Sequence, residues 1–417
     1  MMMVGKDQIF SFVKTPSLVI FGLCLATVTL LGGFRLRWPP NLVNFTIGRL
    51  GYYSTGGETC ELFKGKWIWD EKRPPLYTNL TCKTLPDKKN CLLHGRTDSD
   101  YIRWRWKPAG CELPRFNPSK FLSIVRGKTL AFIGDSVGRN QMESLLCQLS
   151  TEESPNEVYK DAKDRFTTWQ FPKHNFTLMV LWTRFLVNSS QTVVNSSVTG
   201  AFDLHLDKID LNWAQNLPAV DIAIISDAQW FLRENYLYEG GELIGCIYCQ
   251  DPKVTNLGPG FAIQRAFRAA LNYINDCKDC SGILTLLRTY SPSHFENGTW
   301  KTGGSCLRTH PFGTEEIKDH VEDLDYRNIQ VTEVETARKS GQKNGNAYGL
   351  LDVTEAMLMR PDGHPGLHWR RKKKGYSDCV HWCLPGPIDA WNELLLEVLR
   401  QHSPLPLRSK QHALRFN

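Results

Sequence analysis

The sequence predicts an α/β fold, in which a parallel sheet is flanked by helices. It also predicts a small N-terminal subdomain rich in cysteine and tryptophan, and one N-terminal transmembrane helix. Short apolar runs alternate with helical patterns from about residue 117 onward, cysteines and tryptophans gather between residues 57 and 116, and residues 17–34 contain no charge. With 417 residues and a hydrophobic fraction of 41%, the chain has ample material for a core.

The elements of the α/β part are visible as short apolar segments. Buried strands are expected at residues 129–133, 220–226 and 283–287. Helical spacing of apolar residues is found at Leu145, Leu146 and Leu149, and again at residues 261–274 and 388–399. Strands that alternate with helices are typical of a parallel sheet covered on both faces, and sites in such sheets lie beyond the carboxyl ends of the strands.

The segment before this part is different in character. Residues 66–69 and 102–106 alternate between apolar and polar side chains, which predicts half-buried strands. We therefore expect a tail at 1–16, an anchor at 17–34, a stem at 35–56, a cysteine- and tryptophan-rich subdomain at 57–116, a main domain at 117–401 and a C-terminal tail at 402–417.

Residues 17–34 are long enough to cross a bilayer as a helix. Eighteen residues at about 1.5 Å each approach the hydrocarbon thickness of about 30 Å. Lys6 and Lys14 precede the segment and Arg35 and Arg37 follow it, so the flanking charges alone do not set its orientation. A cleaved signal peptide is the alternative, but no clear small-x-small cleavage site follows, which favours an uncleaved anchor.

The residues after the anchor carry marks of an oxidising lumen. Six glycosylation sequons follow it, at Asn44, Asn79, Asn175, Asn188, Asn195 and Asn297. Of 13 cysteines, Cys24 lies inside the anchor, which leaves an even number for disulfides. We therefore expect a cytosolic N-terminus and a lumenal main domain.

The charge of the chain does not indicate a nucleic-acid partner. The formal net charge is +7, and residues 370–374 contribute five basic side chains in one run. Such a run is typical of a solvated loop. Nucleic-acid binding would need basic residues spread over a face with base-stacking partners, and the sequence shows no such pattern.

The first chemical motif is Gly134-Asp135-Ser136 at the end of an expected strand. A serine hydroxyl becomes a nucleophile when a neighbouring base takes its proton. Ser136 would open a helix, whose free N–H groups and positive dipole end favour a developing oxyanion. A plain turn with a helix cap is the alternative interpretation.

The second motif is Asp378-Cys-Val-His381-Trp-Cys383. A carboxylate three residues before a histidine can bind its Nδ1–H and leave Nε2 free as a base. Cys379 and Cys383 flank the histidine, and disulfides there would hold the loop rigid. Tryptophans at 382 and 391 would give the histidine apolar neighbours. The alternative interpretation is a surface aspartate and an ordinary histidine.

A Gly-Asp-Ser after a strand, followed near the C-terminus by Asp-x-x-His, resembles the GDSL/SGNH hydrolase superfamily. Three longer segments resemble the plant trichome birefringence-like proteins: GDSVGRN at 134–140, LRTYSPSHFENGTWKTGGSC at 287–306 and DCVHWCLPGP at 378–387. The resemblance runs from about residue 58 to residue 400. It implies an SGNH/GDSL-like fold and a single-pass, Golgi-anchored O-acetyltransferase of hemicelluloses such as xyloglucan, glucomannan and xylan.

The resemblance also implies roles for individual residues. Ser136, Asp378 and His381 would form the catalytic triad. Cys91 and Cys306 would be disulfide partners of the cysteines around His381. Cysteines expected in disulfides are Cys60, Cys82, Cys91, Cys111, Cys147, Cys306, Cys379 and Cys383.

One block departs from the family pattern. Where relatives usually show Gly-His-Trp, this chain has Ser226-Asp-Ala-Gln-Trp230. The backbone N–H of Ser136 is the safer oxyanion donor. Further oxyanion or auxiliary candidates are Gly134, Asp135, Arg139, Asn140 and Gln229.

Two groups of residues, the Cys-x2-Cys pairs and the tryptophans, allow more than one interpretation. Cys246-x2-Cys249 and Cys277-x2-Cys280 have the spacing of a four-cysteine zinc site, although a lumenal compartment favours disulfides, and no bound metal or cofactor is expected. Most tryptophans are core residues, but one or two are expected to stack on sugar rings. The candidates considered for sugar stacking are Trp104, Trp106, Trp230, Trp369 and Trp382.

The expected reaction is a two-step acetyl transfer through an acetyl-serine, with acetyl-CoA or a carrier intermediate as donor. An acetyl-donor transporter is a candidate partner in the Golgi membrane. An acetylesterase with the same triad, or a non-catalytic protein that binds wall polysaccharides, are the alternatives.

Overall fold

The computed structural model describes residues 52–55, 58–194, 196–370 and 376–405. The chain divides into two compact units, residues 1–47 and 48–417, and all of the described residues lie in the second. Among them, no helix is long and apolar enough to cross a membrane. The expected anchor at 17–34 lies outside the described residues.

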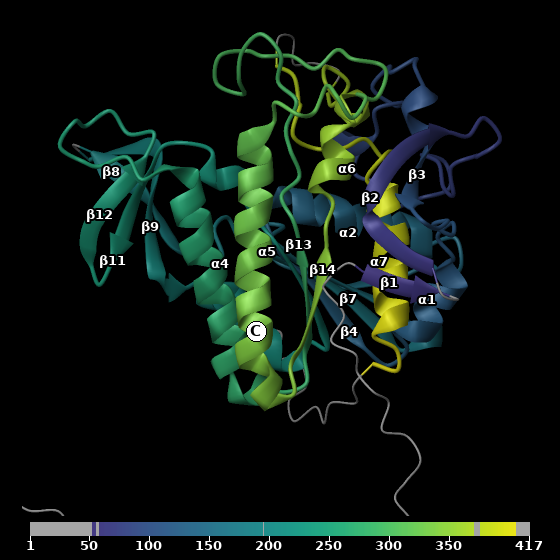
Figure 1. The fold of residues 1–417 in the computed structure, drawn as a ribbon, viewed down its shortest axis with the longest axis horizontal. Helices are drawn as coiled ribbons and strands as arrows, with labels where there is room; N and C mark the ends of the chain where they lie inside the picture. The colour runs from purple at the N-terminus through teal and green to yellow at the C-terminus, as the bar shows by residue number, and fades with distance from the viewer. Residues whose placement is uncertain (1–51, 56–57, 195, 371–375, 406–417) are drawn as a thin grey trace, which may run out of the picture. The chain divides into compact units, whose positions relative to one another are not determined.

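A seven-stranded sheet forms the centre of the fold (Figure 1). Its strands are β4 (Thr129–Gly134), β5 (Asn156–Lys160), β6 (Phe166–Phe171), β7 (Phe176–Trp182), β10 (Ile222–Ser226), β13 (Leu284–Arg288) and β14 (Ala347–Leu351). They are ordered β14-β13-β10-β4-β7-β6-β5, and the three expected apolar runs are its central strands β4, β10 and β13.

The sheet is mixed rather than parallel throughout. The strands from β14 to β7 run parallel, whereas β6 is antiparallel to β7 and β5 is antiparallel to β6. The expectation of a parallel sheet is thus wrong at this edge. Only a short connection joins β6 to β7, and a parallel pair would need a crossover of a dozen residues or more.

Helices cover both faces of the sheet, as expected. They are α1 (Pro118–Ile124), α2 (Ser136–Leu149), α3 (Leu211–Ala214), α4 (Gly258–Asp276), α5 (Val321–Gly341), α6 (Thr354–Leu358) and α7 (Asp389–Gln401). Single 3-10 turns lie at Asp87–Lys89, Asp100–Ile102, Pro172–His174, Leu217–Ala219, Gln229–Phe231, Lys278–Cys280, Gln342–Asn344 and Pro361–Gly363. In Figure 1, α4 and α5 lie together, apart from α2 and α7.

Two hydrophobic cores form because successive side chains of a strand point to opposite faces. Leu130 and Phe132 of β4 belong to the core under α2 and α7, while Ala131 and Ile133 belong to the core under α4 and α5. All four side chains are buried, so β4 is the central strand of the molecule, and the nucleophile candidate follows it directly.

The cysteine- and tryptophan-rich segment folds as a three-stranded antiparallel sheet. Its strands are β1 (Tyr52–Thr55), β2 (Glu58–Trp69) and β3 (Trp104–Ala109). Trp67 and Trp106 pack edge to face, with ring centroids 5.6 Å apart. The Trp67 indole donates a hydrogen bond to the carbonyl of Ala356. This segment therefore shares a core with the main domain.

A third sheet did not emerge from the sequence patterns. Its strands are β8 (Val187–Val194), β9 (Ser197–Ile209), β11 (Asn235–Glu239) and β12 (Glu242–Ile247), ordered β12-β11-β9-β8. Strands β8 and β9 come before β10 along the chain, and β11 and β12 come after it. The third sheet packs against α4.

Six disulfides form within the described residues. They are Cys60–Cys111, Cys82–Cys147, Cys91–Cys383, Cys246–Cys249, Cys277–Cys280 and Cys306–Cys379. The partners expected for Cys379 and Cys383 are confirmed. Each Cys-x2-Cys pair closes on itself, so the disulfide interpretation of these cysteines is confirmed over the zinc site.

Candidate active site

Ser136 is placed by the sharp turn between β4 and α2. Gly134 has a φ of +143°, and a Cβ at this position would lie 1.6 Å from the carbonyl oxygen of Ser226. Only glycine allows β4 and β10 to approach this closely. Asp135 caps the helix, since its Oδ1 accepts the N–H groups of Val137 and Gly138. The half-buried Ser136 is thus the first residue of α2.

His381 lies in a loop and reaches this serine. Its Nε2 is 2.9 Å from Ser136 Oγ, and its Nδ1 is 2.9 Å from Asp378 Oδ2. Asp378 Oδ1 also accepts the backbone N–H groups of Val380 and His381, which closes the turn between the two residues. The three expected triad residues therefore form one continuous hydrogen-bonded chain.

The environment of Asp378 favours its charged form. Burial alone would raise the pKa of this carboxyl group. The charge of His381, the hydrogen bonds from its side chain and backbone, and the nearby Lys89 outweigh burial and lower the pKa below its usual range. Asp378 is therefore a carboxylate that can hold the Nδ1–H tautomer of His381.

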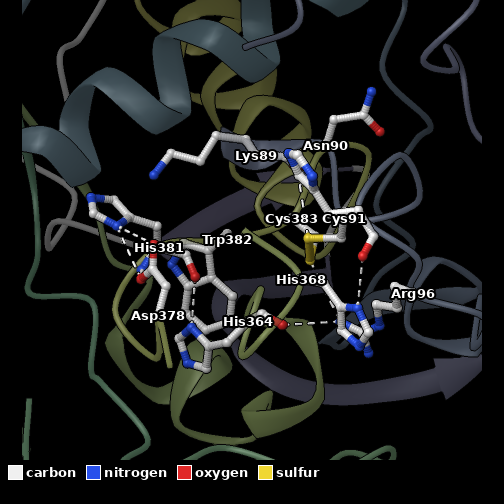
Figure 2. Close-up of a disulfide and its surroundings, with 12 residues drawn as sticks. Lys89, Asn90, Cys91, Arg96, His364, His368, Asp378, His381, Trp382 and Cys383 are labelled. Atoms are coloured by element: carbon white, nitrogen blue, oxygen red, sulfur yellow. Dashed lines mark hydrogen bonds and ion pairs between the residues drawn. A yellow bond between two sulfur atoms is a disulfide. The ribbon is translucent and has the colours of Figure 1, made fainter. Parts of the chain in front are cut away.

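Two disulfides hold the loop that carries His381, and Figure 2 shows the one between Cys91 and Cys383. Cys383 is bonded to Cys91, which is 292 residues away in the chain, and Cys379 is bonded to Cys306. Gly366 adds a pair of backbone hydrogen bonds to Asp378. The loop contains no helix or strand, so these links are what locate His381 opposite Ser136.

The auxiliary candidates next to Ser136 have structural contacts. Asn140 is fully buried, and its Oδ1 accepts the backbone N–H of Trp382 at 2.7 Å. It thus joins the helix that carries Ser136 to the loop that carries His381. Arg139 is paired with Asp164 at 3.4 Å through its guanidinium.

Gln229, in the block that departs from the family, lies against the same turn. Its backbone N–H donates to Asp135 Oδ2 at 3.2 Å, and its side-chain amide donates to the carbonyl of Ser291 at 2.6 Å. The side chain is half-buried. Its oxyanion role stays a prediction, and its visible contacts link the ends of β10 and β13.

Asp227 in the same block is a buried acid that the sequence did not single out. Its side chain is 2% exposed. Burial raises its pKa well above the usual range, and the neighbouring Asp135 raises it further. The backbone N–H of Ala228 and the charge of Arg288 lower the pKa of Asp227, but burial outweighs both. Asp227 therefore favours its neutral form.

The tryptophan candidates separate by burial. Trp382 is 0% exposed, and its ring stacks on that of His364 at 4.1 Å. Its expected role in sugar stacking is wrong, because no face of the ring is left for a ligand. Trp106 is also a core residue. Trp104, Trp230 and Trp369 are half-buried, and the Trp369 indole donates to the carbonyl of Tyr376.

Trp230 is in contact with two arginines that the sequence patterns did not single out. Arg233 Cζ is 4.1 Å from a Trp230 ring centroid and 4.5 Å from that of Trp300, and Arg184 Cζ is 5.1 Å from that of Trp230. No carboxylate of the described residues pairs with either arginine, and each Nε is buried without a partner. We call Arg184, Trp230, Arg233 and Trp300 the arginine–tryptophan cluster.

The cluster flanks the nucleophile turn. Arg184 follows β7, whose last residue Trp182 is in register with Gly134. Trp230 follows Gln229, which donates to Asp135. Strands β7 and β10 lie on either side of β4, so both arginines come from the carboxyl-end edge where Ser136 is located. The signal that could have found them is an arginine in the segment after each of these strands, since Arg184 lies two residues after β7 and Arg233 seven residues after β10.

The chain matches two families in succession. Residues 58–112 match the family described as PMR5 N terminal Domain, and residues 113–398 match the GDSL/SGNH-like Acyl-Esterase family found in Pmr5 and Cas1p. The domain at residues 113–398 therefore belongs to the GDSL/SGNH-like class of acyl-esterases.

Comparison with individual proteins identifies the family of the chain within this class. The chain is 57% identical to xyloglucan O-acetyltransferase 3 of Populus trichocarpa, over 83% of this chain and 87% of the relative. It is 53% identical to xyloglucan O-acetyltransferase 2 of Arabidopsis thaliana, over 82% and 83%. It is 42% identical to protein trichome birefringence-like 20 of Arabidopsis thaliana, over 82% and 72%. The chain belongs to the trichome birefringence-like family.

Proposed function

We propose that this protein transfers acetyl groups to hydroxyls of a hemicellulose, with xyloglucan as the first candidate, through an acetyl-serine intermediate. The observation that carries the proposal is the hydrogen-bonded chain from Ser136 Oγ through His381 to Asp378, with 2.9 Å at each link. The relatives named as xyloglucan O-acetyltransferases support the reaction and the acceptor.

In the first step, Ser136 Oγ attacks the carbonyl carbon of the acetyl donor while His381 Nε2 takes its proton. The bond from the acetyl carbon to the leaving group breaks, and His381 returns the proton to that group. Asp378 stabilises the imidazolium that forms between these events. The product is an ester between Ser136 and the acetyl group.

In the second step, His381 takes the proton of a sugar hydroxyl, whose oxygen attacks the acetyl-serine carbonyl. The ester bond to Ser136 breaks, and the proton passes to the serine oxygen. Asp135 already occupies the N–H groups of Val137 and Gly138, so the backbone N–H of Ser136 is the donor left at the helix start for the oxyanion.

The arginine–tryptophan cluster supports a sugar acceptor. Indole faces pack against the CH faces of sugar rings, and guanidinium groups donate several hydrogen bonds to hydroxyls. We propose that Trp230 and Trp369 contact the glycan. The donor is acetyl-CoA or a carrier intermediate, supplied with the help of a transporter in the same membrane.

We further propose a type II Golgi membrane protein with a lumenal catalytic domain. The uncharged segment 17–34, the sequons and the disulfides support this location. Asn79, Asn175, Asn188 and Asn297 are all exposed, as glycosylation requires, while Asn44 and Asn195 lie outside the described residues. Protease protection of Golgi vesicles, read with antibodies to both ends of the chain, tests this topology.

The reaction is tested with the full chain in detergent. It is incubated with acetyl-CoA and unacetylated oligosaccharides of xyloglucan, glucomannan or xylan, and the products are identified by mass. Acetylated xyloglucan is the expected product, with acetyl-Ser136 trapped when acceptor is omitted. Release of acetate without glycan acetylation would identify an acetylesterase, and glycan binding without acetyl-Ser136 would identify a non-catalytic binding protein.

A further inference from the structure

The peptide group that follows His381 is held at both of its polar atoms. Its carbonyl oxygen, which belongs to His381, lies 2.7 Å from His364 Nδ1. Its N–H, which belongs to Trp382, lies 2.7 Å from Asn140 Oδ1. His364 and Asn140 come from different parts of the chain, and both are buried. Each polar atom of the peptide group after His381 therefore contacts a buried side chain.

Asn140 connects this peptide group to the nucleophile. It is located one helical turn after Ser136 on α2, and residues four apart in a helix lie on the same face. The hydrogen bond from Trp382 therefore ties the base loop to the helix that carries the serine. A change at this contact would alter the distance between Ser136 Oγ and His381 Nε2.

His364 holds the other atom, and a second histidine contacts its far side. His364 Nε2 lies 2.7 Å from Nδ1 of His294, which is 6% exposed. The Nε2 of His294 lies 3.0 Å from the carbonyl oxygen of Leu358, and its backbone N–H donates to the carbonyl of Cys379. Figure 2 shows His364 beside the ring of Trp382.

The surroundings keep both rings neutral. Burial lowers the pKa of His294 well below its usual value and that of His364 to about 4. The neighbouring His364, His320 and Arg308 lower the pKa of His294 further, while the contact with the carbonyl of Leu358 raises it. The contact of His364 with the carbonyl of His381 and the charge of Asp378 raise the pKa of His364, but burial outweighs them, and the charges of His381 and Arg96 lower it further. A neutral imidazole carries one N–H, so the tautomer of each ring decides what it can donate to.

Two neutral rings supply two hydrogens for these three contacts, because a neutral imidazole has one N–H and a carbonyl oxygen only accepts. The contact between His294 and the carbonyl of Leu358 is the longest of the three, at 3.0 Å against 2.7 Å for each of the others. We therefore place one hydrogen on Nδ1 of His364, toward the carbonyl of His381, and the other on Nδ1 of His294, toward Nε2 of His364.

We propose that His364 and Asn140 clamp the peptide group that follows the catalytic histidine. His364 is a positioning residue, and His294 fixes its donating tautomer, in the same way that Asp378 fixes the tautomer of His381. The inference rests on the proposed role of His381 as general base. It assigns a task to two histidines that touch neither the serine nor the acetyl group.

The test compares two replacements of His364 in the full chain, with 4-nitrophenyl acetate as a neutral acetyl donor. His364→Asn keeps an N–H near the position of Nδ1, whereas His364→Leu fills more of the space but donates nothing. Misplacement of a catalytic group by about 1 Å can cost roughly 10²-fold in rate. We expect kcat to fall about 10²-fold in His364→Leu and less than about 10-fold in His364→Asn, with KM within about twofold in both.

The matched control is His368→Leu on the same loop, where His368 Nδ1 contacts the carbonyl of His94 at 3.3 Å. It should leave kcat and KM within about twofold. A second pair tests the tautomer: His294→Asn keeps a donor toward His364, whereas His294→Leu does not, so His294→Leu should have the lower kcat.

We expect His364→Leu to have the higher melting temperature, because leucine fills more of the space, and His364→Asn to have the higher kcat, because asparagine keeps the N–H. If His364→Leu has both the higher melting temperature and the higher kcat, His364 is only a packing residue and the inference is wrong. Ser136→Ala in the same assay separates this from the proposed function. Full activity of Ser136→Ala would overturn the mechanism itself, whereas an inactive Ser136→Ala beside a fully active His364→Leu would overturn only the clamp.

Discussion

The proposed nucleophile and the proposed base of this site are held in place by different means. Ser136 follows a fully buried central strand and opens a 14-residue helix, and its turn is shaped by Gly134 and Asp135. His381 lies in a loop without helix or strand, held by two disulfides, a pair of backbone hydrogen bonds and contacts from buried side chains. Regular structure positions the serine, whereas cross-links from remote segments position the histidine.

This difference follows from how the backbone of each segment is held. Every side chain of β4 is buried and its backbone is paired with β10 and β7, so the core and the sheet together locate the strand. The loop after residue 375 also buries Trp382 and Leu384, but it forms no helix or strand, so specific links must offset the entropy of ordering its backbone. The nucleophile should therefore respond to changes in packing, and the base should respond to loss of its links.

Ser136→Ala should have the largest effect on activity and almost none on the fold. Members of a triad act as a unit, and loss of the nucleophile typically costs on the order of 10⁶ in turnover. Acetyl transfer to xyloglucan oligosaccharides measures the loss, and the melting temperature checks the fold. Retention of more than a few per cent of wild-type turnover would remove Ser136 from the mechanism.

Asp378→Asn should lower kcat by roughly 10⁴, because an amide no longer selects the Nδ1–H tautomer of His381. The lowered pKa of Asp378 also has a consequence for stability. Its contribution is present above the usual pKa of an aspartate and is lost only as the pH falls through the lowered value. Urea unfolding of wild type and variant at several pH values measures this, and an equal pH dependence of the two would contradict it.

Gly134→Ala should disturb the turn that positions Ser136, through a steric clash and an unfavourable φ. The added methyl group would lie 1.6 Å from the carbonyl oxygen of Ser226, at a φ that other residues rarely adopt. We expect a loss of about 3 kcal/mol in the free energy of unfolding and roughly 10²-fold in kcat. The matched control is Gly200→Ala in β9, where a Cβ meets nothing within 4 Å.

Removal of the Cys306–Cys379 disulfide should loosen the loop that positions His381. Alanine at both positions should cost about 4 kcal/mol in the free energy of unfolding, because the disulfide closes a long loop with a sequence separation of 73. We also expect kcat to fall by about 10-fold. The control is the Cys246–Cys249 pair, whose separation of 3 predicts a cost of about 1–2 kcal/mol. Equal costs in the two variants would contradict the comparison.

The same contrast explains what the sequence could predict. The strands β4, β10 and β13 and the helices α2, α4 and α7 were predicted because their apolar residues recur with a local period. The triad was predicted because each half is a short local motif: Gly-Asp-Ser after an apolar strand, and Asp-x-x-His flanked by cysteines.

The parts that were missed depend on contacts between distant segments. His294 and His364 are 70 residues apart, and only the folded chain brings their rings to 2.7 Å. Helix α5 has a largely polar sequence, so its apolar stripe is weak. The burial of Trp382 depends on the stacked ring of His364, which no local pattern records.

Gln229→Ala should have the smallest effect, and it tests the block at residues 226–230 that departs from the family pattern. The side-chain amide of Gln229 already donates to the carbonyl of Ser291, although its NH2 group has a second hydrogen. If that hydrogen serves the oxyanion, its loss should lower kcat by about 10²–10³-fold. If it binds the acceptor sugar, KM for the oligosaccharide should rise with kcat little changed. Because the visible hydrogen bond goes to Ser291, we expect a change of only a few-fold. Kinetics with varied acceptor decide among these outcomes, and a fall of 10²-fold or more in kcat would show that the oxyanion site extends from Ser136 to the end of β10.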